Sequence, residues 1–243
     1  MKLALISDIH GNLQALEAVL KEIEKQVVDE IIFLGDLATI GPQPKEVIEK
    51  IRSLDCPCIT GNHDAALLDM DNFERYKIAP PLYPALDWCL NQLDSADLDF
   101  LSGFKPTLFK SLASGIELLC YHGSPQSNTD IIIRTTEDNV LDNIINEYPA
   151  QIYIGGHTHL QMLRRYNDKI FINPGSAGSA FQMFFMPGET PALLPQAEYS
   201  ILSIDEGKID VTMRQIPFNI KSLKESISIS DIPIKDWWLD QYC

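Results

Sequence analysis

The chain has 243 residues, 45% hydrophobic and 22% charged, which is the composition of an ordinary folded protein with one large domain over residues 1–243. Its formal net charge of −15 argues against tight binding to long nucleic acids, because that affinity depends on Lys and Arg neutralising phosphates. No stretch approaches the ~18 apolar residues of a membrane span. The apolar run at the start of the sequence is too short and wrongly flanked for a signal peptide. Five cysteines form no disulfide framework, so we expect a cytoplasmic, reducing location.

The first part of the chain alternates between apolar strands and amphipathic helices. Residues 2–6 form an apolar run typical of a buried parallel strand, and residues 12–26 repeat apolar side chains at helical spacing. Residues 31–34 predict a second strand, a helix begins at Pro44, and residues 58–60 predict a third strand. This order of elements predicts a sheet that is largely parallel.

Residues 65–105 differ from this pattern. Prolines interrupt the segment, apolar residues at helical spacing follow over 86–93, and 97–101 predicts a further helical turn. The segment contains no histidine and few basic residues, so it is a candidate helical cap inserted between two motifs. Helices packed on the sheet as ordinary core are an equally good interpretation.

Strands dominate the second part of the chain. A strand is predicted at 116–121, a helix at 137–147 and a further strand at 152–154. Residues 178–198 show no clear period and predict a loop, and the tail around Trp237 is expected to pack on the body or against a partner. The later strands indicate an antiparallel or mixed sheet, and they are predicted at 160–166, 169–173, 199–204 and 208–215.

All five histidines lie in four short motifs, and a fifth motif adds a carboxylate. Four of the five motifs follow a predicted strand, and the loops at strand ends of an α/β sheet converge on one edge. Imidazole, carboxylate and amide oxygens together suit divalent cations such as Mn²⁺, Fe²⁺ or Zn²⁺. Asp36 has no histidine neighbour, so we expect it to bridge two ions about 3.5–4 Å apart. The motifs are Ser7-Asp8-Ile9-His10, Gly35-Asp36, Gly61-Asn62-His63-Asp64, Tyr121-His122-Gly123 and Gly155-Gly156-His157-Thr158-His159.

The order of these motifs, D-x-H, G-D, G-N-H-D, a lone H and G-G-H-T-H, resembles the calcineurin-like metallophosphoesterase superfamily over residues 1–64 and 116–210. Its small prokaryotic phosphodiesterase branch is the most similar. The resemblance implies an α/β (α+β) fold with two mixed β-sheets packed as a sandwich, flanking helices and a two-metal site at one edge. His63 would face the phosphate, and Asp64 could hold His63 in orientation. The implied ligands are Asp8, His10, Asp36 and His159 for the first ion, and Asp36, Asn62, His122 and His157 for the second.

The implied reaction is hydrolysis of a small phosphodiester or nucleotide by in-line attack of a hydroxide shared between two divalent ions. Mn²⁺ is the expected ion, with Fe, Zn and Ni as alternatives. His63 would neutralise charge and protonate the leaving oxygen. A hydrolase selective for dinucleoside polyphosphates and a non-catalytic metal-binding scaffold are the alternatives. A homo-oligomer and a monomer both fit the sequence.

One segment departs from the pattern of the family. The turn Asn173-Pro174-Gly175-Ser176 is present, but apolar residues 180–186 replace a stretch that is basic in relatives of this size. This departure argues against a phosphate held by arginine and leaves room for a nucleobase or an aryl group. The phenylalanines Phe181, Phe184 and Phe185 fit packing or an interface equally well.

Overall fold

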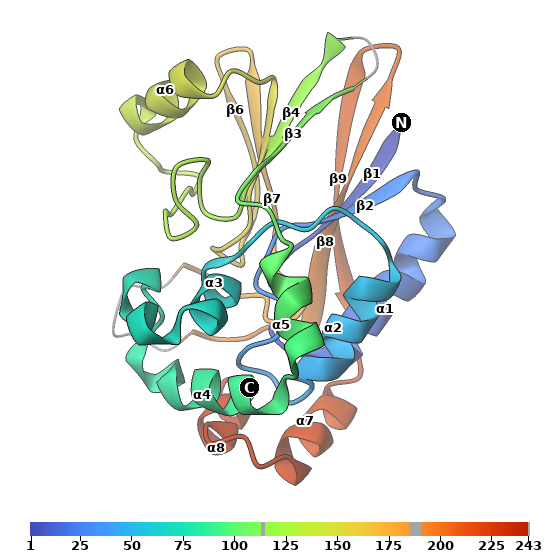
Figure 1. The fold of residues 1–243 in the computed structure, drawn as a ribbon. Helices are drawn as coiled ribbons and strands as arrows, with labels where there is room; N and C mark the ends of the chain where they lie inside the picture. The colour runs from blue at the N-terminus through green and yellow to red at the C-terminus, as the bar shows by residue number, and fades with distance from the viewer. Residues whose placement is uncertain (113–114, 185–190, 243) are drawn as a thin grey trace.

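The computed structural model describes residues 1–112, 115–184 and 191–242. Two mixed β-sheets face each other, and helices cover their outer surfaces (Figure 1). The predicted fold class, two mixed sheets with flanking helices, is confirmed. Among the described residues, no helix has the length and apolar character needed to cross a membrane.

The first sheet contains four strands in the order β2-β1-β8-β9. Strands β1 and β2 pair in parallel, as predicted, whereas β8 runs antiparallel to both β1 and β9. Because the chain returns to this sheet only at β8, the sheet combines the first two strands of the chain with the last two. The strands are β1 (Lys2–Ile6), β2 (Glu30–Phe33), β8 (Gln196–Asp205) and β9 (Lys208–Pro217).

The second sheet contains five strands in the order β3-β4-β5-β7-β6. Its three central strands pair in parallel, and the edge strands β3 and β6 pair antiparallel to their neighbours. The strands are β3 (Leu108–Ser111), β4 (Glu117–Cys120), β5 (Ile152–Ile154), β6 (Gln161–Tyr166) and β7 (Lys169–Pro174).

Alternation along the strands divides the apolar residues between the inner and outer faces of the sheets. Leu3 and Leu5 of β1 belong to the same apolar cluster as Leu118 of β4 and Ile154 of β5, which fills the space between the sheets. The opposite face of β1 packs against α1 and α2, and α6 covers the outer face of the second sheet. These helices are α1 (Leu13–Gln26), α2 (Pro44–Ser53) and α6 (Asp138–Glu147).

The segment predicted as a candidate cap is helical. Leu86, Cys89 and Leu101 are fully buried or nearly so, and they join the core formed by α1 and α2. Residues 77, 79 and 80 are exposed instead and line a pocket described below. The segment therefore contributes to the core as well as to the pocket. Its helices are α3 (Asn62–Leu68), η1 (Met70–Tyr76), η2 (Pro80–Leu82), α4 (Tyr83–Gln92) and α5 (Ser95–Ser102).

Three segments differ from the sequence-based expectation. Residues 58–60 make only isolated bridges, Cys58 to Phe33 and Ile59 to Lys105, because the chain turns into α3 at Gly61 before a strand can extend. Strand β8 begins at residue 196, within the predicted loop, because its pairing with β9 continues to that point. Strand β3 was not predicted, and residues 185 and 186 of the apolar stretch lie outside the described residues.

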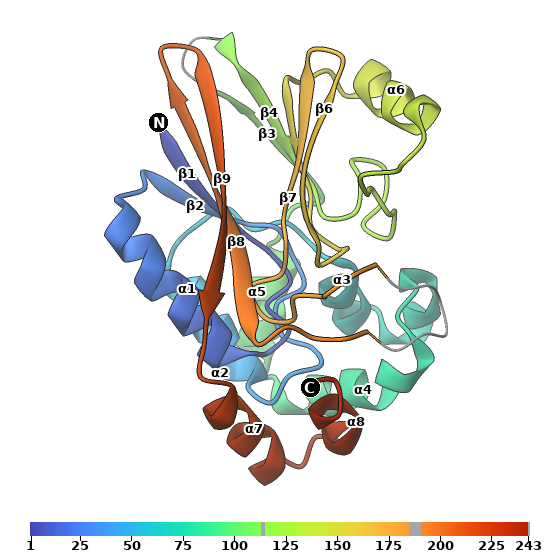
Figure 2. The same ribbon diagram turned by 180° about the vertical axis from the view of Figure 1, so that it is seen from behind.

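The C-terminal tail packs on the body of the molecule through α7 (Ile220–Ile229) and α8 (Lys235–Leu239) (Figure 2). Trp238 is 2% exposed and lies in an apolar cluster with Leu223 and Ile40. The tail thus packs on the body, which is one of the two arrangements expected from the sequence. This packing covers one side of the loop that follows Asp36.

Candidate metal centre

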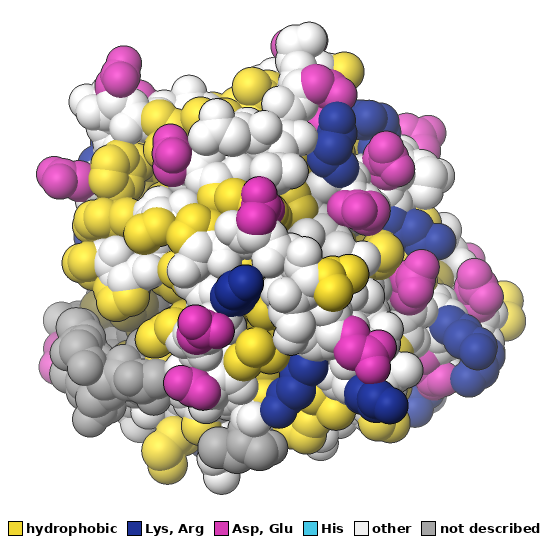
Figure 3. Space-filling view, turned by 90° about the horizontal axis from the view of Figure 1, so that it is seen from below, with side chains coloured by type: hydrophobic (Ala, Val, Ile, Leu, Met, Phe, Trp, Pro, Cys, Tyr) yellow, Lys and Arg dark blue, Asp and Glu magenta, His cyan; other side chains and the backbone are white. Residues whose placement is uncertain are grey.

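The predicted site residues come together at one edge of the sandwich. Each lies just beyond the end of a strand or at the start of α3, so loops far apart in sequence meet there. The histidines are largely withdrawn from solvent: none is visible on the face shown in Figure 3, and only His157 is half-buried rather than buried. The residues that converge are Asp8 and His10 after β1, Asp36 after β2, Asn62 and His63 in α3, His122 after β4, and His157 and His159 after β5.

Much of the site is held in a strained backbone conformation. Five site residues have φ angles between +48° and +68°, a region that residues with a side chain rarely adopt. Such conformations cost on the order of 1–3 kcal/mol each and persist where the surrounding structure enforces them. Backbone hydrogen bonds between the first two loops provide part of that enforcement, Asp8 N to Gly35 O at 2.9 Å among them. The five residues are Asp8, His10, Asp36, His157 and His159.

Glycines allow the loops to approach one another closely. A side chain at Gly61 would overlap the carboxylate of Asp36, and one at Gly156 would overlap the hydroxyl of Ser7. The backbone at these two positions therefore lies directly against the site, and no larger residue fits without displacing it.

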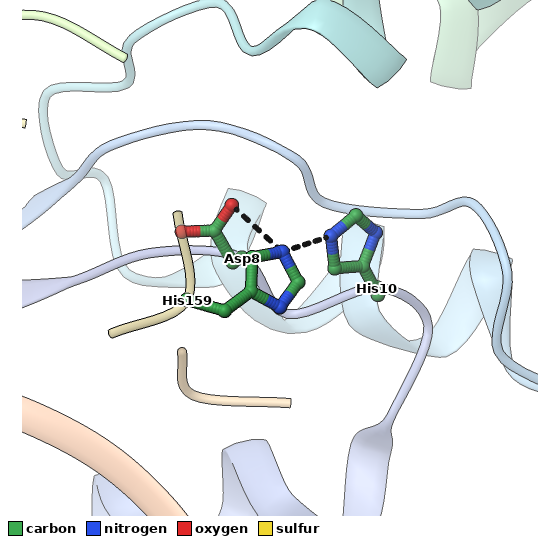
Figure 4. Close-up of side chains that lie close together, drawn as sticks. All are labelled: Asp8, His10 and His159. Carbon is green, nitrogen blue, oxygen red and sulfur yellow. Dashed lines mark hydrogen bonds and ion pairs between the residues drawn. The ribbon is translucent and has the colours of Figure 1, made fainter. Parts of the chain in front are cut away.

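Asp8, His10 and His159 form the first group of donors (Figure 4). Nδ1 of His159 lies 2.7 Å from the carbonyl oxygen of Ser179, so this nitrogen carries the proton and Nε2 presents a lone pair. Nε2 of His159 lies 3.1 Å from Nε2 of His10 and 3.4 Å from Oδ1 of Asp8. Three electron-pair donors thus face the same small space.

Asp36, His122 and His157 form a second group, with Asn62 beside them. Nδ1 of His122 donates to the carbonyl oxygen of Leu34 at 2.7 Å, so Nε2 is the ring nitrogen that faces the site. The amide nitrogen of Asn62 donates to Tyr76 O at 3.0 Å, so its oxygen points inward, 3.2 Å from His122 Nε2 and 3.1 Å from His157 Nδ1.

Asp36 lies between the two groups. Its Oδ2 is 3.3 Å from Nε2 of His122 in the second group and 3.7 Å from Nε2 of His10 in the first. Asp36 also anchors α3, since its Oδ1 accepts a hydrogen bond from the backbone amide of His63 at 2.9 Å.

The donor set fits divalent cations. Oδ1 of Asp8 is buried and makes no hydrogen bond of ordinary geometry among the described residues, and Nε2 of His159 and of His122 face it at 3.4 Å and 3.9 Å. A buried carboxylate oxygen without a partner costs free energy unless a cation or another donor compensates it. Carboxylates, imidazoles and an amide oxygen are the ligands that Mn²⁺, Fe²⁺ and Zn²⁺ accept.

The electrostatics of the cluster keep the carboxylates ionised. Burial opposes ionisation of Asp36, but the imidazoles of His122 and His63 outweigh it and hold the pKa of Asp36 well below its ordinary value. Burial likewise favours neutral His122, yet the Asp36 carboxylate prevails and raises the pKa of His122 to about 10. Burial lowers the pKa of His157 to about 3. A divalent cation binding here would displace the proton on His122.

The contact expected between Asp64 and His63 is replaced by a different one. Both oxygens of Asp64 accept hydrogen bonds from backbone amides, those of Asp36 and Gly61 on Oδ2 and that of Leu37 on Oδ1, at 2.8–2.9 Å. Nδ1 of His63 instead lies 2.8 Å from Oγ1 of Thr39. Asp64 therefore shapes the loop after β2. Sequence reasoning missed Thr39, whose only signal was its place three residues after Asp36.

A pocket of about 530 Å³ opens beside the site. Site residues form one side, and His63 lies there with its ring edge-on to His10 at 4.9 Å between centroids. The other side is mainly apolar and comes from the segment 78–83, from Ile131 and from the described phenylalanines of the apolar stretch. Phe181 stacks on His159 with ring centroids 4.2 Å apart.

A model of the calcineurin-like phosphoesterase superfamily domain matches residues 1–200. The chain belongs to the calcineurin-like phosphoesterase superfamily. The resemblance predicted from motif order is thereby confirmed. Membership of this superfamily implies a metal-dependent phosphoester hydrolase, in agreement with the donor clusters of the structure.

Similarity to other proteins extends over nearly the whole chain. An uncharacterised protein of Methanocaldococcus jannaschii is 29% identical over 249 aligned residues, covering 95% of this chain and 93% of the relative. The structure of a metallophosphoesterase from Sphaerobacter thermophilus is 25% identical, with a TM-score of 0.72 and coverage of 94% and 93%. A hypothetical protein from Pyrococcus horikoshii has the same fold at 20% identity, with a TM-score of 0.80 and coverage of 98% and 97%.

Proposed function

We propose that this calcineurin-like phosphoesterase hydrolyses a small phosphodiester with two divalent ions, Mn²⁺ in the first place. Asp8, His10, Asp36 and His159 would hold one ion, and Asp36, Asn62, His122 and His157 would hold the other. The observation that carries the proposal is the position of Asp36, whose Oδ2 lies 3.7 Å from His10 Nε2 and 3.3 Å from His122 Nε2. A carboxylate between two donor groups is the arrangement that a two-metal site requires.

The metals, when bound, would lower the pKa of a coordinated water and neutralise charge on the phosphate. In the overall reaction a water oxygen forms a new bond to phosphorus, and the bond from phosphorus to the leaving oxygen breaks. Carbonyl contacts at Nδ1 of His122 and His159 leave Nε2 of each ring facing the site, which supports their proposed role as ligands.

His63 would act on the substrate. Its ring lines the pocket next to His10, and its backbone amide is fixed by Asp36. From this position His63 would contact a phosphate oxygen and protonate the leaving oxygen. Thr39 would hold the ring in place through Nδ1.

The decisive experiment begins with protein stripped of metal by a chelator. Hydrolysis of bis(p-nitrophenyl) phosphate and p-nitrophenyl phosphate is measured before and after Mn²⁺ is added back, and bound Mn²⁺ is counted by elemental analysis. We expect about two ions per chain and turnover of the diester only with metal. Two bound ions without turnover of either ester by Mn²⁺, Fe²⁺, Zn²⁺ or Ni²⁺ would favour the scaffold alternative.

Ligand variants separate the two metal positions. Asp36→Asn weakens the residue proposed to bridge, so it should reduce the affinity for both ions. His157→Ala affects a residue of the second group alone and should leave about one ion bound. Equal stoichiometry in both variants would contradict the bridging role. Circular dichroism of each variant checks that the fold is retained.

A further inference from the structure

The pocket beside the metal centre has two chemically distinct sides. The site residues form its polar side, whereas Ile40, Ile78, Leu82 and Tyr83 contribute to the apolar side. Ile78 and Ile40 are buried at 4% and 9% exposure, so this side is backed by the protein core. The volume of about 530 Å³ lies within the range of sites that bind small molecules.

Apolar side chains also continue onto the exposed rim. Ile131 is 51% exposed and Phe184 is 39% exposed, and both line the pocket. Phe181 stacks against His159, so the apolar side directly adjoins a proposed metal ligand. Exposed apolar groups beside a polar centre are typical of a surface that a ligand covers.

Positive charge is scarce in this pocket. Lys77 is the one Lys or Arg side chain that lines it within the described residues, and Glu74 stands on the same segment. A chain of phosphates would need several Lys or Arg side chains or a set of amide donors to compensate its charge. The apolar side of the pocket provides neither kind of group. The metals would compensate negative charge only at the scissile phosphate.

Building on the proposed function, we infer that the scissile phosphate carries an uncharged, largely apolar substituent, and that this substituent binds between Ile78, Ile131 and Phe181. Binding of such a substituent is favourable because it removes apolar surface from water. An aryl group, an alkyl chain and a nucleobase share this chemistry. A dinucleoside polyphosphate does not, because its anionic chain would have to lie along the apolar side.

Binding tests this inference separately from catalysis. Calorimetry on the Mn²⁺-loaded protein compares phenylphosphonate with methylphosphonate, which have the same anionic group and differ in the apolar part. We expect phenylphosphonate to bind about 10-fold more tightly, as a hydrophobic pocket that accepts the ring requires. Equal affinities of the two phosphonates would overturn the inference.

Three variants localise the effect. Ile131→Ser and Phe181→Ala should each reduce the preference for phenylphosphonate over methylphosphonate at least about threefold. Phe109→Ala is the matched control, because Phe109 is 53% exposed on β3 and does not line the pocket. Bound Mn²⁺ is measured in Phe181→Ala, whose ring contacts His159. An unchanged preference in both pocket variants would contradict the inference.

Hydrolysis distinguishes the sources of the substituent. Thymidine 5′-(p-nitrophenyl) phosphate represents the nucleobase, and bis(p-nitrophenyl) phosphate represents the aryl group. Hydrolysis of diadenosine tetraphosphate is measured by chromatography. If this compound is hydrolysed more efficiently than either diester, the inference is overturned, although the protein would still be a phosphoesterase. A preference for phenylphosphonate without hydrolysis of any ester would support the pocket and refute the proposed function.

Discussion

Oγ1 of Thr39 lies 2.8 Å from Nδ1 of His63, and both side chains are buried. The loop that supplies Asp36 to the candidate metal centre thus also supports the residue proposed to face the phosphate. Because a hydroxyl can both donate and accept, this contact is compatible with either tautomer of His63.

Removal of the Thr39 hydroxyl tests this support. Thr39→Val keeps the shape of the side chain and should lower kcat for the diester about 10-fold, with little change in KM, because the ring loses its fixed orientation. Thr39→Ser keeps the hydroxyl and should retain most of the activity. If valine and serine have equal effects, the contact matters for packing rather than for positioning.

The role of His63 as an acid predicts a dependence on the leaving group. With methyl phenyl phosphate, His63→Gln should lower kcat by about 10²-fold or more, because phenolate leaves poorly without a proton. With methyl p-nitrophenyl phosphate the loss should be much smaller, since p-nitrophenolate needs no proton. An equal loss for both esters would assign His63 to charge neutralisation alone. Bound Mn²⁺ should stay the same in the variant.

We expect Asp64 to contribute to the stability of the fold rather than to orient His63. It is fully buried and accepts hydrogen bonds from three backbone amides, so Asp64→Asn turns an amide NH₂ group toward backbone N–H donors. We expect the free energy of unfolding to fall by about 2–4 kcal/mol in urea titrations. Asp71→Asn, at an exposed position, is the control. Loss of activity with unchanged stability would support the orienting role instead.

Glu198 predicts a pH dependence of stability. It is 3% exposed, its Oε1 accepts from Gln215 Nε2 at 3.1 Å, and burial raises its pKa to about 7 from an ordinary value of 4.5. Because the folded-state pKa is raised, the folded protein binds this proton more tightly, and stability is lost as the pH rises from about 4.5 through 7.

Glu198→Gln should therefore leave stability nearly unchanged at pH 5 and increase it by about 1–3 kcal/mol at pH 8. Thermal unfolding of both proteins across this pH range measures the difference in stability between them. The histidines are present in both proteins, so their titration cancels in this difference. Glu24→Gln, at an exposed position, should show no such pH-dependent gain. A gain that is equal at pH 5 and pH 8 would argue against a buried ionisable Glu198.

Local patterns allowed much of the fold to be predicted. The helical repeat at Leu16, Val19 and Leu20 matches α1, and the apolar run of β1 matches a strand covered on both faces. Such patterns reflect burial of one side of an element, which neighbouring residues encode. The short pairing at 58–60 and the start of β8 were misjudged, because hydrogen bonds to distant strands decide where pairing ends.

By itself, the sequence determined the metal-type donors and their order, because each motif is a short run of neighbouring residues. Only the tertiary structure decided that Asp36 lies between two donor groups, that Thr39 rather than Asp64 contacts His63, and that one side of the pocket is apolar. These relationships join loops that lie far apart along the chain or depend on how a single loop turns. Their geometry follows from the packing of the two sheets and the helices around them.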